Sequence, residues 1–316
     1  MQLYEMIYSR LVSDTPLGEL LASYNNRPAV FYQRPATADD NKWDKRIING
    51  QDFEIQYPRI NYFVDLQENP SRNTGGTLTV HVFCDAMYGA EPEEIDARLK
   101  ELLHITFAQT DDYLYCLSWL RSDAFEVKSK DEETIRTYGV TVIFDLVACP
   151  SQLTLKPDPI KGMNEWTKTI LQNSFVVGMD AVDTEDGWLV PTRERPVIYW
   201  RITAQGKAKQ TFVCTWLDIT IEGHVYCRNA ADRLYNLIQI NTAYALAHHI
   251  PLEDGSPLFL KSFNVQPHMN YTTTGQIRAV GNFGLLQPWY GKPPQNPIHP
   301  IVDYTIDGKK GENGDG

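Results

Sequence analysis

Positive charge is scarce in this sequence. Its 316 residues include 29 Lys and Arg against 40 Asp and Glu, which gives a formal net charge of −11. Proteins that bind nucleic-acid phosphates carry a basic surface, and this chain lacks the charge to build one over most of its area. We therefore expect the protein to repel DNA and RNA rather than to bind them.

Cysteine and long apolar runs are also limited. The five cysteines are an odd number and too few for a disulfide framework, so we expect reduced thiols in an intracellular or virion protein. No signal-peptide pattern opens the chain, and no apolar run approaches the roughly 20 residues that cross a bilayer. The best candidate, residues 139–149, is too short and contains Asp145. We expect neither secretion nor contact with a membrane.

Motifs of common catalytic and cofactor sites are absent from the sequence. It contains no Walker loop, dinucleotide fingerprint, Gly-x-Ser-x-Gly elbow, His-Glu-x-x-His or Cys-x-x-Cys. His81 and Cys84 are three residues apart on an expected strand, as are His224 and Cys227, so the two side chains of each pair leave opposite faces. Neither pair is arranged to share a metal. The sequence therefore predicts no catalytic residue, no cofactor and no metal site.

Three other sets of residues with reactive side chains have an ordinary structural role, which makes a catalytic role unnecessary. Adjacent His248 and His249 point in different directions at a helix end, where a histidine interacts with the helix dipole. Asp111 and Asp112 precede an apolar strand and fit a solvated turn. Cys116 lies among apolar residues and is expected to be a buried small hydrophobe. Aromatic residues mostly alternate with apolar ones, which favours a core or a protein interface over stacking against bases.

The most informative feature that is present is an internal repeat. Aligning residues 78–84 with residues 221–227 places cysteine on cysteine and histidine on histidine, and preserves the alternation of strand faces. Two proline-led segments, residues 57–63 and 195–201, align upstream of them. Chains of mixed helices and strands also repeat such an order by chance. The alternative to coincidence is a tandem duplication of one unit.

Each half also contains two helical patterns and a closing strand. Pro92 suits the first turn of one helix, and Asn229 suits the N-cap of its counterpart. The apolar positions expected to face the core are Leu3, Ile7 and Leu11 in the first opening helix, Trp166, Ile170 and Phe175 in the second, Ile95, Leu99, Leu102 and Leu103 in the first crossing helix, and Ala231, Leu234, Leu237 and Ile238 in the second. The closing strands alternate through Val140, Val142, Phe144 and Leu146, and through Ile277, Ala279, Gly281, Phe283 and Leu285.

These patterns predict an α+β fold of two similar units, each a mainly antiparallel sheet packed with helices. We place the first unit at residues 1–150, a linker at 151–164 and the second unit at 165–287. Residues 288–316 are rich in proline and glycine, which exclude regular helix, and are expected to form an extended C-terminal arm.

The unit resembles the tail-terminator, or tail-completion, proteins of tailed bacteriophages. The resemblance lies in the order of an opening helix at 3–12, strands at 59–65 and 77–84, a helix at 93–104 and a closing strand at 139–149, and it extends to 166–287 if the repeat is real. It implies a small α+β unit that assembles as a ring at the head-proximal end of the tail. It further implies a structural virion protein of the tail or neck, made in the host cytoplasm, with no enzymatic activity.

A terminator is usually a single unit, whereas this chain holds two. The resemblance therefore leaves two rings open, a hexamer or a trimer with pseudo-sixfold symmetry. It implies other tail and neck proteins as partners, and DNA only as it passes through the lumen, where acidic walls would let it slide. Two other classes stay open. One is a tail-tube, baseplate or other tail adaptor acting as a protein-binding module, and the other, with less support, is a hydrolase acting through Asp or His.

Partner contacts are expected in loops rather than in pockets. The loops are residues 34–50, 68–76 and 178–195, together with the C-terminal arm. The candidate interface residues in these segments are Asp39, Asp40, Trp43, Asp44, Asn69, Arg72, Trp188, Arg193, Trp289 and Tyr290.

Overall fold

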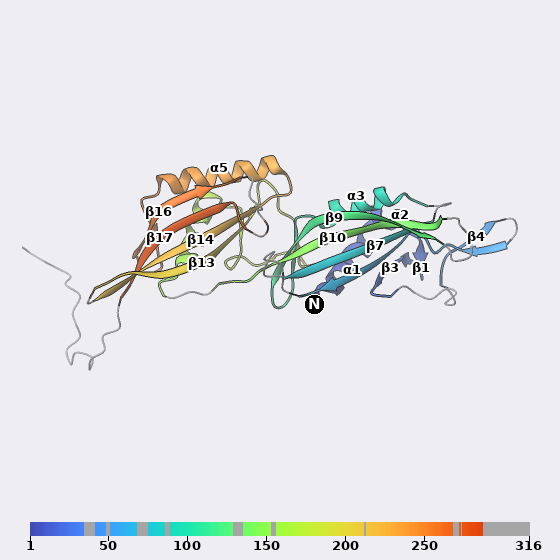
Figure 1. Ribbon diagram of the computed structural model, residues 1–316, viewed down its shortest axis with the longest axis horizontal. Helices are drawn as coiled ribbons and strands as arrows, with labels where there is room; N and C mark the ends of the chain where they lie inside the picture. Colours follow the sequence, from blue (N-terminus) through green and yellow to red (C-terminus); the bar gives the residue numbers. More distant parts are fainter. Residues whose placement is uncertain are drawn as a thin grey trace, which may run out of the picture.

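The computed structural model of the protein describes residues 1–34, 42–48, 51–67, 75–85, 89–128, 135–152, 156–211, 213–267, 272 and 274–286. The C-terminal arm expected at 288–316 lies outside these residues. The described chain forms two α+β units, one after the other along the long axis of the molecule (Figure 1). We call residues 1–152 unit 1 and residues 156–286 unit 2.

Unit 1 is a sheet with helices packed on it. Its elements are α1 (Leu3–Ser13), α2 (Thr15–Leu20), β1 (Ser23–Tyr24), β2 (Arg27–Pro28), β3 (Val30–Tyr32), β4 (Lys45–Ile48), β5 (Gln51–Glu54), β6 (Arg59–Asp65), β7 (Gly76–Asp85), α3 (Pro92–Leu103), β8 (Thr106–Gln109), β9 (Leu114–Lys128) and β10 (Ile135–Cys149). Its own strands follow the order β8–β9–β10–β7–β6–β3, antiparallel except for the parallel pair of β3 and β6. β1–β2 and β4–β5 are separate two-stranded hairpins.

Unit 2 repeats this arrangement. Its elements are α4 (Pro159–Ile170), β11 (Phe175–Val176), β12 (Trp188–Leu189), β13 (Val197–Gln210), β14 (Cys214–Tyr226), α5 (Ala230–Leu246), β15 (Ile250–Pro251), β16 (Pro257–Val265) and β17 (Ile277–Leu286). The sheet order is β15–β16–β17–β14–β13–β11, and its parallel pair is β11 with β13. Strand order and strand sense match those of unit 1 one for one. The expected α+β fold of two similar units is confirmed.

The strand registers agree with the sequence alignment of the two halves. In unit 1, Arg59 pairs with Phe83, and in unit 2, Val197 pairs with Tyr226. The sequence alignment places Arg59 on Val197 and Phe83 on Tyr226, so the two pairs correspond residue by residue. A shift of one residue in either unit would have turned every side chain of a strand to the other face. Coincidence of element order does not explain a shared register.

α1 and α3 bury the face that their periodicity predicts, whereas Trp166 and Ile170 of α4 are only partly buried against the core of unit 2. The expected core positions of α1 and α3 are all buried, and Pro92 lies in the first turn of α3. Asn229 is the N-cap of α5, and its side-chain oxygen accepts the Ala231 N–H at 2.8 Å. α3 and α5 lie on the same side of their sheets, and the two units follow one another along the long axis (Figure 1).

α5 turns a different face to its sheet than the one expected. The buried residues of α5 are Asn236, Leu237, Ile240 and Tyr244. Leu234 and Ile238, expected to face the core, are 43% and 53% exposed, and Ala231 is exposed as well. The prediction for these three residues is wrong because the helix carries apolar residues on two faces. Periodicity locates both faces without saying which one meets the sheet.

The boundary between the units also differs from expectation. α4 begins at Pro159, inside the expected linker at 151–164, because Asp158 caps it. The Asp158 carboxylate accepts the N–H groups of Ile160 and Lys161 at 2.8 and 3.3 Å. Phe175, considered as a continuation of the opening helix, lies instead in β11.

Candidate functional site

The histidines and cysteines that align in the two halves do not form metal sites. Cys84 is buried in the core of unit 1, while the His81 ring lies on the other face of β7, its Nδ1 atom 2.9 Å from Thr141 Oγ1. In unit 2 the Cys227 thiol donates to a backbone carbonyl, and the buried His224 ring stacks on a neighbouring tyrosine. Among the described residues, no group of three or more His, Cys, Asp and Glu side chains is placed to hold a metal.

The other residues that could carry a catalytic role lie in separate parts of the fold. His248 and His249 are exposed beyond the end of α5. Asp111 is exposed and forms an ion pair with the N-terminal amine of Met1 at 2.9 Å. Cys116 is fully buried, and burial raises the pKa of its thiol well above the usual value. The expectation that Cys116 is a buried small hydrophobe is confirmed.

The best-defined interaction surface is instead a contact between the units, made by residues 177–195 of unit 2. In this segment β12 pairs antiparallel with β8 of unit 1, so that Trp188 faces Ala108. The Gln109 N–H donates to the Gly187 carbonyl at 2.9 Å. The sheet of unit 1 thus has a seventh strand that comes from unit 2. This added strand covers an edge that would otherwise expose unpaired backbone groups.

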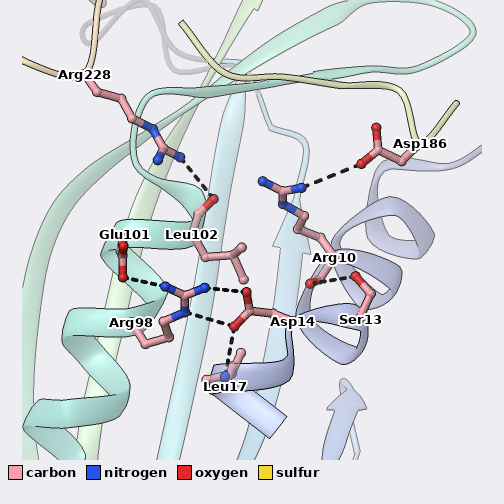
Figure 2. Close-up of polar contacts among 9 residues, drawn as sticks. All are labelled: Arg10, Ser13, Asp14, Leu17, Arg98, Glu101, Leu102, Asp186 and Arg228. Atoms are coloured by element: carbon pink, nitrogen blue, oxygen red, sulfur yellow. Dashed lines mark hydrogen bonds and ion pairs between the residues drawn. The ribbon is translucent and has the colours of Figure 1, made fainter. Parts of the chain in front are cut away.

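Trp188 anchors the added strand in unit 1. Its side chain is 4% exposed and belongs to the core of that unit. The Arg10 guanidinium of α1 lies 5.5 Å from the centroid of the Trp188 ring and 3.6 Å from the Asp186 carboxylate (Figure 2). Gly187 has a φ of +70°, and a Cβ atom there would meet the Met6 side chain at 2.9 Å. Glycine therefore permits both the turn and the close approach to α1.

A second polar contact joins the units at the end of α3. An Arg228 Nη2 atom of unit 2 donates to the Leu102 carbonyl at 3.4 Å, where the helix dipole favours a cation (Figure 2). Burial lowers the pKa of the Arg228 guanidinium. Burial is also the main cause that lowers the pKa of His104, and the nearby Arg228 cation lowers it further. The arginine is therefore held inside the junction rather than in open solvent.

An apolar cluster fills the rest of the junction. It contains Ile105, Phe107, Leu114, Cys116, Val147 and Cys149 from unit 1 and Phe175, Val177, Leu189, Val197, Tyr199 and Tyr226 from unit 2. The Phe107 and Tyr226 rings meet edge to face with centroids 5.0 Å apart. Burial raises the pKa of Cys149 to about 12. A shared, closely packed core of this kind fixes one unit on the other.

The candidate interface residues fall into three groups. Trp43 and Trp188 are 3% and 4% exposed, so their side chains pack inside the chain instead of meeting a partner as expected. Asp44 and Arg193 are exposed, and the Arg193 guanidinium lies 4.2 Å from the centroid of the Tyr235 ring. Asp39, Asp40, Asn69, Arg72, Trp289 and Tyr290 lie outside the described residues.

Sequence reasoning identified residues 178–195 as an interacting segment but not the surface that they contact. Trp188 and Leu189 form too short a strand for periodicity to reveal, and only the preceding Gly187 and the β-favouring side chains hint at one. The role of Arg10 was also missed, because one arginine in an amphipathic helix reads as a solvated position.

Below this junction, Asp14 joins α2 to α3. Its Oδ1 atom accepts the Leu17 N–H at 2.9 Å and so caps α2. The Arg98 guanidinium of α3 donates from Nε to Oδ1 at 2.9 Å and from Nη2 to Oδ2 at 2.6 Å (Figure 2). The hydrogen bonds from Arg98 hold the pKa of Asp14 below its usual value of 3.8. The Asp14 side chain is 11% exposed, so solvent screens this pair only partly.

We expect Asp14→Asn to lower the free energy of unfolding at pH 7 by about 1–3 kcal/mol, because it removes a charge-assisted bidentate pair. The folded-state pKa of Asp14 is lowered, so its contribution is complete above the unfolded-state pKa and is lost as the pH falls through the folded-state value. Urea unfolding at pH 7, 4 and 3 should therefore show a smaller loss on acidification for the variant than for the wild type.

Asp123→Asn is the matched control for this measurement. Asp123 also pairs with an arginine, Arg121, at 2.9 Å, but its side chain is 56% exposed and its interaction is screened by water. We expect this variant to retain the pH dependence of the wild type. Equal pH profiles for Asp14→Asn and the wild type would contradict the role given to Asp14.

No protein-family model and no curated protein sequence matches the chain. No helix among the described residues has the length and apolar character needed to cross a bilayer.

Proposed function

We propose that this chain is a structural virion protein of a phage or phage-like tail. It forms a ring at the head-proximal end, terminates the tail tube and joins the tube to the head connector. The observation that supports this proposal is the repetition of a unit resembling a tail terminator, with the same strand order and register in both copies. A chain that carries two such units in one fixed arrangement is suited to a ring of repeated units.

Surfaces suited to assembly support the same proposal. Large apolar side chains are exposed on many of the described residues, including some in the β4–β5 hairpin, at the end of α5 and in β16 and β17. They include Ile47, Phe53, Leu246, Phe259 and Leu286, which are 42–81% exposed. Edge strands and exposed apolar side chains are completed by neighbours in closed assemblies. The net charge of −11 also suits the wall of a channel through which DNA slides.

Immunogold labelling of particles from the source of this sequence tests the proposal. Antibodies raised against the chain are expected to label the junction of head and tail. A knockout of the gene is expected to produce heads and tails that do not join. Label along the tube or at the distal end of the tail would support an adaptor instead. Particles that carry no label, with normal assembly in the knockout, would overturn a structural role.

A further inference from the structure

The contact between the two units of one chain has counterparts at both free ends of the molecule. In the junction, unit 2 contributes the segment that follows its parallel edge strand β11, and unit 1 contributes the β8 edge. The counterpart of the first surface is the segment between β3 and β6, which contains the β4–β5 hairpin. The counterpart of the second is the β15 edge, because β15 pairs with β16 as β8 pairs with β9.

The β4–β5 hairpin, which we call the arm and which is distinct from the expected C-terminal arm, projects from one end of unit 1 (Figure 1). Its base is fixed because the buried Trp43 forms a β-bridge with Tyr24, and the two rings meet edge to face with centroids 5.0 Å apart. The Ile55 N–H donates to the Asp44 carbonyl at 2.8 Å and closes the hairpin at that base. Beyond the base, Ile47 is 73% exposed and Phe53 is 47% exposed. Two exposed apolar side chains on a two-stranded projection are typical of a segment that packs on a partner.

The opposite end of the molecule carries the matching edge. In unit 2, no described strand pairs with the outer edge of β15, whereas the equivalent β8 edge of unit 1 is covered by β12. Leu246 at the end of α5 is 77% exposed, and Phe259 in β16 is 42% exposed. The His249 ring lies 6.2 Å from the Phe259 ring, which places the exposed residues that precede β15 beside this edge.

The arrangement of the units favours one mode of contact between chains. Figure 1 shows β4 at one end of the long axis and unit 2 at the other, with α3 and α5 on the same side. The two ends of the molecule carry different surfaces, so a contact between the hairpin of one chain and the β15 edge of another joins the chains head to tail. Such a contact closes into a ring when the rotation between successive units permits it.

We infer that the arm of one chain docks on the β15 edge of a second copy, and so repeats between chains the contact that β12 makes on β8 within a chain. Ile47 and Phe53 pack near Leu246 and Phe259 of the neighbour. This inference rests on the proposed ring and names its subunit contact. Every unit in the ring then receives a segment from the next unit, alternately from its own chain and from the neighbouring chain.

Two double variants test the contact from its two sides. Ile47→Asp with Phe53→Asp places charges on the arm, and Leu246→Asp with Phe259→Asp places charges beside the β15 edge. All four side chains are exposed, so the fold is expected to survive, which circular dichroism verifies. Burying an unpaired charge is costly, so either variant should weaken association at least about tenfold. Leu234→Asp with Ile238→Asp, at residues of α5 that are 43% and 53% exposed outside both surfaces, is the matched control.

Native mass spectrometry across a concentration series gives the decisive measurement. The wild type and the control are expected to form one multi-chain species, and each double variant is expected to remain a single chain. An equimolar mixture of the two double variants retains one intact arm and one intact edge, so it should form a complex of two chains and no larger species. A contact of arm with arm, or of edge with edge, would not give this result, because one of the double variants would then associate with itself.

The possible results of these measurements distinguish a failure of the inferred contact from a failure of the proposed function. If both double variants still form the wild-type oligomer, or if their mixture yields no two-chain complex, the arm–edge contact is wrong and the ring proposal is unaffected. If the wild type remains a single chain at every concentration, the inferred contact is overturned. The immunogold result then decides independently whether the proposed function falls with it.

Discussion

Replacing Trp188 by alanine is expected to lower the free energy of unfolding by about 3–5 kcal/mol and to separate the unfolding of the two units. The side chain is 4% exposed, and it lies in the core of unit 1 although it belongs to unit 2. Its removal leaves a cavity beside α1 and removes the ring under the Arg10 guanidinium. The Gln109–Gly187 hydrogen bond and Leu189 in the shared cluster also hold β12 on β8, but only Trp188 reaches into the core of unit 1.

Urea unfolding followed by circular dichroism, together with hydrogen exchange of the separate elements, measures this effect. The amides of β8 and of residues 177–195 should exchange faster in Trp188→Ala, while those of β14 and β17 should change little. Trp119→Ala is the matched control, because Trp119 is 38% exposed on β9 and its loss should cost about 1 kcal/mol. A uniform increase in exchange across both units would contradict the role of Trp188 as a local clamp.

The repeat could be predicted from the sequence because it depends on register and turn chemistry, which are local. The alignment that places Cys84 on Cys227 also places Arg59 on Val197, and the strand pairings agree with both matches. Pro92 and Asn229 marked the helix starts because each satisfies the backbone at a helix N-terminus. These signals do not depend on which other surface a residue contacts.

Contacts between segments far apart in the sequence could not be predicted in the same way. Trp43 and Trp188 are aromatic residues in loops, a pattern that favours a partner interface, yet each is buried against another part of the same chain. Leu234 and Ile238 lie on an apolar stripe that is exposed in the single chain. Burial of a loop residue depends on long-range packing, and sequence periodicity carries no information about it.

The two units also fill the same core position with different pairs of residues, and the larger ring is matched by the smaller facing residue. Tyr62 on β6 faces Val80 on β7, and the equivalent residues of unit 2 are Trp200 and Gly223. The Tyr62 hydroxyl donates to the Tyr4 carbonyl of α1 at 2.7 Å. Both aromatic rings are fully buried, and each connects its sheet to the opening helix of its unit. The larger ring thus faces the smaller residue.

Trp200 plays the same part in unit 2. Its Nε1–H donates to Thr167 Oγ1 of α4 at 2.9 Å, and the Thr167 hydroxyl lies 2.7 Å from the Met163 carbonyl. A Cβ atom on Gly223 would lie 2.3–2.9 Å from three carbons of the Trp200 ring. Glycine is therefore required at this position by the bulk of the indole rather than by backbone conformation.

We expect Gly223→Val to lower the free energy of unfolding of unit 2 by about 3 kcal/mol or more, because the added side chain overlaps a fully buried ring in a closely packed core. Trp200→Tyr alone should cost about 1–3 kcal/mol, since it leaves a cavity and takes the donor away from Thr167. Urea unfolding at pH 7 measures both losses. Val80→Ala in unit 1 is the control for a change of size at the equivalent position.

The double variant Trp200→Tyr with Gly223→Val installs the pair that unit 1 already uses. If the two units share one packing scheme, the smaller ring makes room for the valine, and the double variant loses less stability than the sum of the single losses. A coupling of about 1–3 kcal/mol in this cycle is expected for side chains in direct contact. Additive losses would show that the two cores are packed differently. The common register would then reflect a shared topology without interchangeable parts.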